Sequence, residues 1–248
     1  MKKIAYLTID DAPNKDFLKK VDFLLSKKIP TIWFCRGELI EHKTEELVYA
    51  LEKGQVIGNH AWDNPYFSNL SIEKCFQQIK KTDKALEKVY QAAKINWQYK
   101  YFRFPYGDKG GNKNSKDYEK DITYDKRGVG KKEKIQNFLR SLGYTKPKFK
   151  GITYKYYYDN GYDKDVDWYW TYDCLEYALF SSKNHFGINS IEKVFSRMDE
   201  DVPEGCRGLN YPNSEDIILL HDHEETTKYF EPILNRLLQK KIELRRPE

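Results

Sequence analysis

The sequence predicts an α/β fold in which helices cover a parallel sheet. Short apolar runs alternate along the chain with longer stretches whose apolar residues recur at helical spacing. Such alternation is typical of strand–helix–strand units, which place parallel strands in one sheet. Several of the apolar runs also end abruptly in polar side chains. Folds of this class carry their active sites at the carboxyl ends of the strands, so these side chains are candidates for function.

The first strand is expected over residues 4–9, and it is followed at once by Asp10 and Asp11. Two adjacent carboxylates repel each other, so burying both requires a cation, a proton or strong hydrogen-bond donors beside them. A metal ion is the natural candidate. The alternative is that both aspartates cap the next helix and face water.

The remaining elements follow from apolar spacing and from the residues that stop each run. Pro30 separates the first helix from the second strand, and Gly54 closes a short helix before the third strand. The expected strands cover residues 4–9, 31–35, 55–58, 99–105, 166–172 and 217–220, with a last extended segment at 242–244. The expected helices cover residues 16–27, 45–52, 71–93, 133–142, 190–198 and 227–240.

The region around residues 107–165 is expected to be an insertion of loops and a hairpin. Its first part, to about residue 132, is rich in Lys, Asp, Asn and Gly, which predicts an exposed excursion. Tyr and Trp residues then crowd between residues 154 and 172, where we expect a hairpin that turns at Asp159-Asn160-Gly161. These rings could stack on a sugar, or they could pack the hairpin on the body of the protein.

The composition is that of one globular domain. The chain has 248 residues, of which 40% are hydrophobic and 15% aromatic, so it can bury a full core, and no repeat or low-complexity linker divides it. We therefore expect a single domain over residues 1–248. The 43 Lys and Arg residues are interspersed with 38 Asp and Glu residues, and the resulting net charge of +5 does not imply a nucleic-acid partner.

The cysteines and the apolar runs indicate neither disulfides nor a membrane span. No CxxC spacing occurs, and we expect Cys35, Cys75, Cys174 and Cys206 to be free thiols. No apolar run approaches the roughly 18 residues of a membrane span. Met1-Lys2-Lys3 leads directly into the first strand without the apolar region of a signal peptide. We expect a cytoplasmic protein from the chain as it stands, or a secreted one whose leader has been removed.

The expected strand ends carry a set of reactive side chains in a definite order: Asp10 and Asp11, His60, Arg103 with Tyr106, Asp173 and His221. In this order the sequence resembles the polysaccharide deacetylase family, the NodB-homology domains of carbohydrate esterase family 4, from residue 4 to residue 244. The resemblance implies a distorted (β/α) barrel. It also implies a hydrolase that uses a divalent metal to remove N- or O-acetyl groups from a saccharide or polysaccharide.

Two motifs carry the resemblance at the metal. Thr8-Ile9-Asp10-Asp11-Ala12-Pro13 resembles the family's TFDDGP, which makes Asp10 the catalytic base and Asp11 a metal ligand. The segment that starts at Asn59 resembles the metal-binding H-x-x-x-H and places His60 in the first ligand position. The metal implied is zinc. Other divalent ions remain open because Asn64 stands where the second histidine is usual.

A third motif supports the base and the reacting oxygen. Phe102-Arg103-Phe104-Pro105-Tyr106-Gly107 resembles the family's R-x-P-Y. The resemblance makes Arg103 the residue that orients the catalytic base, and it gives the backbone N–H of Tyr106 a part in holding the oxyanion. Asp173 would brace that arginine, because it occupies the first aspartate of a motif that resembles W-x-x-D-x-x-D-W.

The groove and the general acid are implied by the last two motifs. Trp170 begins the segment that resembles W-x-x-D-x-x-D-W, and Tyr177 ends it in place of a groove tryptophan, so both are candidates for substrate binding. Leu219-Leu220-His221 matches L-x-H, which implies an acetyl-pocket leucine at Leu219 and a catalytic acid at His221.

The substitution at Asn64 leaves more than one interpretation open. Its amide oxygen could ligate a harder or looser metal, water or His223 could complete the shell, or the metal could be lost in a catalytically silent carbohydrate-binding relative. Hydrolysis of a small non-sugar amide or imide is a further alternative on the same fold. Each residue also has a structural alternative when taken singly, such as an ion pair between Arg103 and Asp173.

Overall fold

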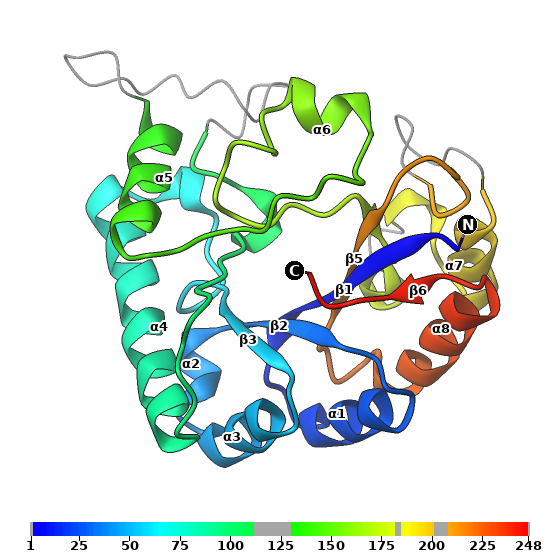
Figure 1. Ribbon diagram of the computed structural model, residues 1–248, viewed down its shortest axis with the longest axis horizontal. Coiled ribbons are helices and arrows are strands. Elements are labelled where there is room, and N and C mark those ends of the chain that lie inside the picture. The colour runs from blue at the N-terminus through cyan, green and yellow to red at the C-terminus, as the bar shows by residue number, and fades with distance from the viewer. Residues whose placement is uncertain (1, 112–129, 182–184, 201–207, 248) are drawn as a thin grey trace.

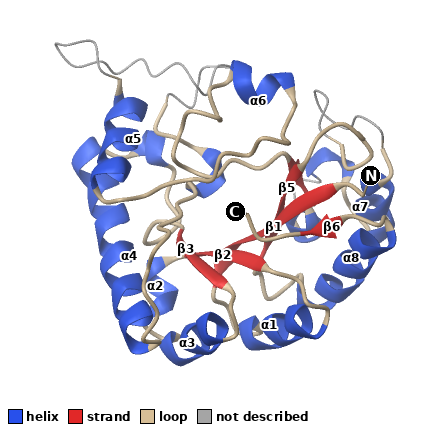
Figure 2. Ribbon diagram, in the orientation of Figure 1, coloured by secondary structure: helices blue, strands red, loops and turns tan. Residues whose placement is uncertain are grey.

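A parallel sheet forms the centre of the molecule, and helices surround it (Figures 1 and 2). The computed structural model describes residues 2–111, 130–181, 185–200 and 208–247. The strands are β1 (Ile4–Ala12), β2 (Thr31–Cys35), β3 (Val56–Asn59), β4 (Tyr172–Asp173), β5 (Asp216–His221) and β6 (Glu243–Leu244). The sheet order is β3-β2-β1-β5-β4, with β6 paired to β1. All of these pairings are parallel, as the alternation of strands and helices predicts.

Helices surround the sheet, and the longer ones lie where apolar residues recur at helical spacing. They are α1 (Phe17–Ser26), α2 (Gly37–Ile40), α3 (Thr44–Glu52), α4 (Ile72–Ala92), α5 (Lys131–Ser141), α6 (Lys155–Asp159), α7 (Ile191–Met198) and α8 (Thr227–Gln239). Short 3₁₀ turns cover Phe67–Asn69, Pro105–Gly107, Glu176–Phe180 and His185–Gly187. No helix in the described part of the chain is long and apolar enough to cross a membrane.

The central strand β1 brings together two ends of the sequence. It pairs with β2 on one edge and with β5 on the other, and Asp10 is in register with His221. The register with β2 is irregular between Ile9 and Ala12, which is a bulge-like feature at the strand's carboxyl end. The polar ends of β1 and β5 therefore lie side by side, although about 200 residues separate them in the sequence.

The barrel is completed by segments that make single hydrogen bonds instead of strand ladders. The linking backbone bonds are Asn59 N to Tyr101 O (2.8 Å), Arg103 N to Asn59 O (3.0 Å), Trp168 N to Phe102 O (2.8 Å) and Thr171 N to Ile217 O (3.0 Å). The strand expected over residues 99–105 is wrong, because only isolated bridges occur there. Of the strand expected over 166–172, only its end belongs to β4. The result is a distorted barrel.

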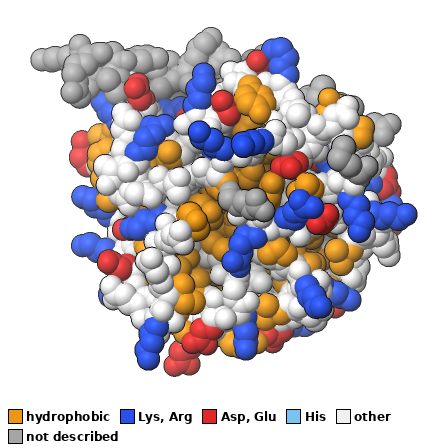
Figure 3. All heavy atoms as spheres, in the orientation of Figure 1, with side chains coloured by type: hydrophobic (Ala, Val, Ile, Leu, Met, Phe, Trp, Pro, Cys, Tyr) orange, Lys and Arg blue, Asp and Glu red, His pale blue; other side chains and the backbone are white. Residues whose placement is uncertain are grey.

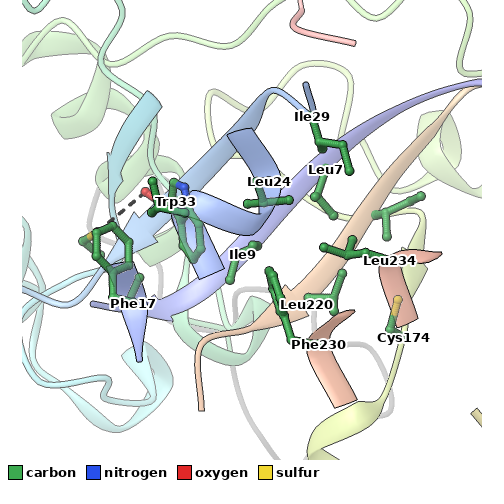
Figure 4. Close-up of a cluster of buried hydrophobic side chains, with 14 of the residues drawn as sticks. Leu7, Ile9, Phe17, Leu24, Ile29, Trp33, Cys174, Leu220, Phe230 and Leu234 are labelled. Carbon is green, nitrogen blue, oxygen red and sulfur yellow. Dashed lines mark hydrogen bonds between the residues drawn. The ribbon is translucent and has the colours of Figure 1, made fainter. Parts of the chain in front are cut away.

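Alternate residues of each strand face two different cores. Trp33 of β2 and Leu220 of β5 pack toward the helices with Leu7, Ile9 and Phe230, as Figure 4 shows. Their neighbours on the same strands point to the opposite face, into the barrel, where aromatic rings of the segment between residues 152 and 168 fill the interior. This alternation follows from the two-residue period of a strand.

The aromatic segment does not form the expected hairpin. Residues 155–159 form α6, and Tyr157 and Trp168 are buried in the barrel interior. Packing on the body is therefore the correct interpretation for these two rings. A ladder between two short local strands could not bury so many rings, whereas the barrel interior offers them a long-range partner surface.

The flanks of the lysine-rich excursion are buried, contrary to expectation. Lys109 lies 2.6 Å from Asp165 and 3.2 Å from Asp167, and Lys131 donates to the carbonyls of Phe67 and Leu70. Residues 112–129, the centre of the excursion, lie outside the described residues. Free thiols are confirmed for three cysteines, Cys35, Cys75 and Cys174, which are all buried. Cys206 also lies outside the described residues.

The end of the barrel where the strands begin is closed by the carboxyl-terminal residues. The N–H of Arg245 donates to the carbonyl of Ala5 at 2.9 Å, directly after β6 has paired with the start of β1. Figure 3 shows the face on which the carboxyl terminus lies, with apolar side chains gathered at its centre and Lys and Arg side chains around them. The opposite end of the barrel remains open.

Candidate active site

A pocket of about 330 Å³ lies at the carboxyl ends of the strands. It is lined by Asp10, Asp11, His60, Asn64, Tyr66, Tyr106, Trp170, Asp173, Tyr177, Leu219, His221 and His223. Every residue that the sequence motifs single out lines this pocket, apart from Arg103, which lies fully buried beneath it. The sequence motifs do not indicate Tyr66, and they leave His223 as an alternative only.

Arg103 holds Asp10 from below the pocket. Its Nη1 donates to Asp10 Oδ1 at 2.9 Å and to Thr8 Oγ1 at 2.7 Å, while its Nε donates to the carbonyl of Trp168 at 3.0 Å. The guanidinium also lies over the ring of Phe34, 4.5 Å from its centre. A buried carboxylate needs such a partner. The other oxygen of Asp10, Oδ2, lies 3.7 Å from Nε2 of His60.

Asp11 points to a different side of the pocket from Asp10 because the backbone turns at the strand end. Its φ is 63°, in the left-handed region, where the β1–β2 register is also irregular. Asp11 Oδ2 lies 2.8 Å from His223 Nε2. Burial alone would raise the pKa of Asp11, but the His223 hydrogen bond and the nearby histidine charges lower it well below its usual range.

His60 presents one ring nitrogen to the two aspartates. Its Nδ1 lies 2.9 Å from the carbonyl oxygen of Arg103. A carbonyl can only accept, so Nδ1 carries the hydrogen. In the neutral ring Nε2 then offers a lone pair, 3.8 Å from Asp11 Oδ1. A backbone carbonyl that fixes the tautomer in this way is typical of metal-binding histidines.

Two buried oxygens of residues that line the pocket accept no hydrogen bond from the described residues. They are Asp11 Oδ1 and Asn64 Oδ1. Buried acceptors without a donor are costly, and a cation bound by both would satisfy them. Together with His60 Nε2 they make a donor set of two oxygens and one nitrogen, which fits a divalent cation and is harder than a set with two histidines. The residues therefore fit the metal that the family resemblance implies.

His221, in register with Asp10 on the neighbouring strand, is paired with Glu176. Glu176 Oε1 accepts from the backbone N–H of His221 at 2.5 Å and lies 3.1 Å from its Nδ1. Burial would lower the pKa of His221, but the charge and hydrogen bond of Glu176, with Asp173 and Asp11, raise it to about 10. The sequence motifs do not single out Glu176. Its position at the second aspartate of W-x-x-D-x-x-D-W is the signal that could have identified it.

Asp173 does not brace Arg103 as expected. Within the described ranges no ion pair joins the two, and Asp173 Oδ1 accepts from the backbone N–H of Leu175 at 2.8 Å. Burial raises the pKa of Asp173 to about 6, against the lowering effect of the His221 charge. Asp173, Glu176 and His221 also offer ligand atoms within 4.8 Å of one another. They form a second group that could hold a metal, although Glu176 already occupies His221 Nδ1.

Aromatic rings form the rim of the pocket. Tyr66 and Tyr106 stack with their ring centres 4.0 Å apart, and 55% of Tyr106 is exposed. Trp170 stacks on Tyr169 at 4.5 Å. A Cβ at Gly107 would lie 2.9 Å from the Trp170 ring, and its φ of 65° is one that favours glycine. Tyr106 of the R-x-P-Y segment and Trp170 therefore place two flat rings in the lining of the pocket, and such rings can stack on a pyranose.

The chain matches a known family over its first half and a known fold over nearly its whole length. Residues 1–126 match the family model described as polysaccharide deacetylase. The chain belongs to the polysaccharide deacetylase family. This confirms the resemblance that the motifs indicate.

Several curated relatives are named as peptidoglycan deacetylases. This chain is 32% identical over 88 residues, 35% of its length, to the peptidoglycan-N-acetylmuramic acid deacetylase PdaC of Bacillus subtilis. It is 30% identical over 103 residues, 41% of its length, to a peptidoglycan-N-acetylglucosamine deacetylase of Bacillus cereus. The matches span only 19% and 36% of these two relatives.

Solved structures of the family share the fold. A chitin deacetylase from the fungus Colletotrichum lindemuthianum has a TM-score of 0.63 at 14% identity, covering 99% of this chain and 85% of that one. PdaC of Bacillus subtilis has a TM-score of 0.58 at 20% identity, covering 98% of this chain and 87% of that one. A CE4 family pseudoenzyme from Bacillus anthracis has a TM-score of 0.60 at 15% identity, covering 98% of this chain and 63% of that one. These likenesses confirm the distorted barrel.

Proposed function

We propose that this polysaccharide deacetylase removes acetyl groups from an N- or O-acetylated saccharide or polysaccharide by metal-dependent hydrolysis. The observation that carries the proposal is the pairing of β1 with β5, which puts Asp10 in register with His221 where both residues line the pocket. A carboxylate and a protonated imidazole that line one pocket can act as base and acid on the same scissile bond. The names of the curated relatives favour a peptidoglycan-type amino sugar.

Asp10 is the proposed general base. Arg103 fixes its Oδ1, so Oδ2 is the oxygen free to take a proton from the attacking water. Asp11, His60 and Asn64 would hold the divalent cation, with zinc as the first candidate. When bound, it supplies Lewis-acid polarisation of the acetyl carbonyl and of the water.

His221 is the proposed general acid. Its Nδ1 faces Glu176, so its Nε2 is left to give a proton to the departing amine or alkoxide. A pKa raised to about 10 keeps the imidazole protonated at neutral pH. The backbone N–H of Tyr106 would help to hold the oxyanion, and Leu219 would contact the acetyl methyl group in the wall of the pocket.

The aromatic rim would bind the sugar. Tyr106, Trp170 and Tyr177 line the pocket, and Tyr66 extends the same rim by stacking on Tyr106. Flat rings bury the apolar face of a pyranose without requiring a particular charge on it. This arrangement suits a neutral N-acetylated sugar ring at the point of reaction.

The test is acetate release from defined substrates. Peptidoglycan fragments, chitooligosaccharides and acetylated xylan should be compared with and without a chelator, and the metal then restored. We expect release from at least one amino-sugar substrate, loss on chelation and recovery with zinc, while Asp10→Asn should be inactive throughout. Full activity after complete metal removal, or in the Asp10→Asn variant, would overturn the mechanism.

The second candidate is a carbohydrate-binding protein without turnover. Asn64 in place of a histidine favours it, since an amide oxygen is a weaker zinc ligand than an imidazole. Glycan binding with no acetate release under any divalent metal, together with unchanged binding in Asp10→Asn, would select this candidate over the enzyme.

A further inference from the structure

Helix α1 buries a lysine among its apolar contacts with the sheet. Phe17, Val21 and Leu24 are the apolar residues on its buried face, and Lys20 lies on that face as well, with only 2% of its surface exposed. Lys20 Nζ lies 2.5 Å from Oδ1 of Asp222, which is fully buried. Replacing a buried ion pair of this kind with apolar side chains is often neutral or stabilising, so stability alone does not explain it.

The pair is tied to the two chain segments that carry the site. Asp222 Oδ2 accepts from the backbone N–H of Asn14 at 2.7 Å, and the N–H of Asp222 donates to the carbonyl of Asp10 at 2.8 Å. The side-chain amide of Asn14 donates to the carbonyls of Asp11 and Asp222. These bonds fix the end of β5 against the end of β1.

Lys20 also reaches the residue that follows Asp222. Its Nζ lies 3.2 Å from the carbonyl of His223, and the ring of His223 lies 2.8 Å from Asp11 Oδ2. That hydrogen bond occupies Oδ2 of Asp11, while Oδ1 of Asp11 faces His60. His223 thus acts on Asp11 through a hydrogen bond and has no need to ligate a metal itself. Partners of this kind orient a ligating carboxylate.

We infer that Lys20 and Asp222 are positioning residues, which hold His221 and His223 in place against Asp10 and Asp11. Asp222 stands between the two histidines in the sequence, and Lys20 makes directional bonds to its side chain and to the carbonyl of His223. We call the Lys20–Asp222 pair the anchor. Its expected effect on metal affinity rests on the proposed function. Its effect on the placement of the two imidazoles does not rest on that function and can be measured without metal.

The test variant removes both charges together, so that neither is left buried and unpaired. In Lys20→Met/Asp222→Asn we expect a folded protein in which the imidazole nitrogen resonances of His221 and His223 move, while that of His42 stays as in wild type. Zinc affinity, measured by titration calorimetry, should fall about 10- to 100-fold. The matched control is Lys3→Met/Asp216→Asn, which neutralises another largely buried pair, at the first residue of β5 and away from the pocket, and should change neither readout.

Unchanged resonances of His221 and His223 in the folded, metal-free double variant would overturn the inference. If the double variant does not fold, Lys20→Gln keeps a donor for Asp222 without the charge and is judged by the same resonances. A wild-type protein that binds no zinc and releases no acetate would refute the proposed function, and the metal-free spectra would still decide on the anchor.

Discussion

Glu176 Oε1 binds His221 twice, accepting from its backbone N–H at 2.5 Å and lying 3.1 Å from its ring Nδ1. One carboxylate oxygen therefore fixes both the position of the residue and the orientation of its imidazole. It also fixes the tautomer, since the carboxylate accepts at Nδ1, and so the proton that can leave in the reaction is on Nε2.

Glu176→Gln should move the alkaline limb of the pH–rate profile to lower pH. In the proposed reaction His221 acts in its protonated form, and a pKa of about 10 keeps it protonated well above neutrality. An uncharged amide removes the favourable charge interaction with the imidazolium, so the pKa should fall toward the ordinary value of 6.5. Measuring kcat between about pH 5 and about pH 11 checks this shift. The control is Glu224→Gln, which changes an exposed carboxylate paired with Lys15 and should leave the alkaline limb in place. An alkaline limb that moves in neither variant would refute the acid role of His221.

Arg103→Met should cost both stability and turnover. The guanidinium is fully buried against Asp10, and removing one partner of a buried pair leaves the other charge uncompensated, which costs about 3–5 kcal/mol of unfolding free energy. Urea denaturation measures that loss, and kcat should fall by roughly 100-fold or more because the base is no longer oriented.

The double variant Arg103→Met/Asp10→Asn separates the two effects. With both charges removed the fold should regain part of the lost stability, while activity stays absent because the base is gone. Equal stability of the single and double variants would show that the ion pair is not what Arg103 contributes to the fold.

The parts of the fold that the sequence predicts well are those with local signals. β1 and β5 are apolar runs that end in polar residues, and their ends meet in the structure as the parallel-sheet prediction requires. Helices such as α4 and α8 have strong apolar periodicity and lie close to their expected bounds. Most of the pocket residues could be predicted because they follow one of these strand ends or occupy a motif position, whereas Tyr66 does neither.

What the sequence does not predict depends on contacts between distant segments. The alternation of tyrosines before residue 159 is compatible with a strand, but Tyr157 is buried in the barrel interior by packing that no local pattern encodes. Residues 99–105 look like a strand and yet make only isolated bridges, one from Phe102 to Asn59 at the end of β3 and one from Lys100 to the distant Tyr144. His221 pairs with Glu176, and Asp173 accepts from Leu175 instead of bracing Arg103, because of side-chain directions that spacing alone cannot give.

Tyr66→Ala should weaken substrate binding without slowing the reaction itself. Tyr66 supports the exposed ring of Tyr106 by stacking at 4.0 Å, and losing one aromatic contact at a sugar site should raise KM about 2- to 10-fold. The increase should be larger for long oligosaccharides than for a disaccharide, while kcat stays near the wild-type value. Tyr158→Ala removes an exposed ring of α6 that does not line the pocket and serves as the control. The same KM change in both variants would assign no role to the rim.

The last prediction tests the residue that departs from the family motif. Asn64→His should raise zinc affinity, because imidazole is a better zinc ligand than an amide oxygen and would complete a set with Asp11 and His60. The backbone permits this change, since Asn64 has a φ of 57° and histidine is among the side chains that tolerate this region. Titration calorimetry with zinc measures the gain, and turnover need not rise with it.

Asn64→Gly is the matched loss of the same ligand, because glycine accepts the left-handed φ of this position at little cost to the fold. It should weaken zinc binding while the thermal stability of the metal-free protein stays close to that of wild type. Asp63→Ala, at the exposed neighbouring position, should leave zinc affinity unchanged. If Asn64→His, Asn64→Gly and wild type all bind zinc equally, then the unpartnered oxygen of Asn64 does not face the cation, and Asp11 and His60 hold it with water in the remaining positions.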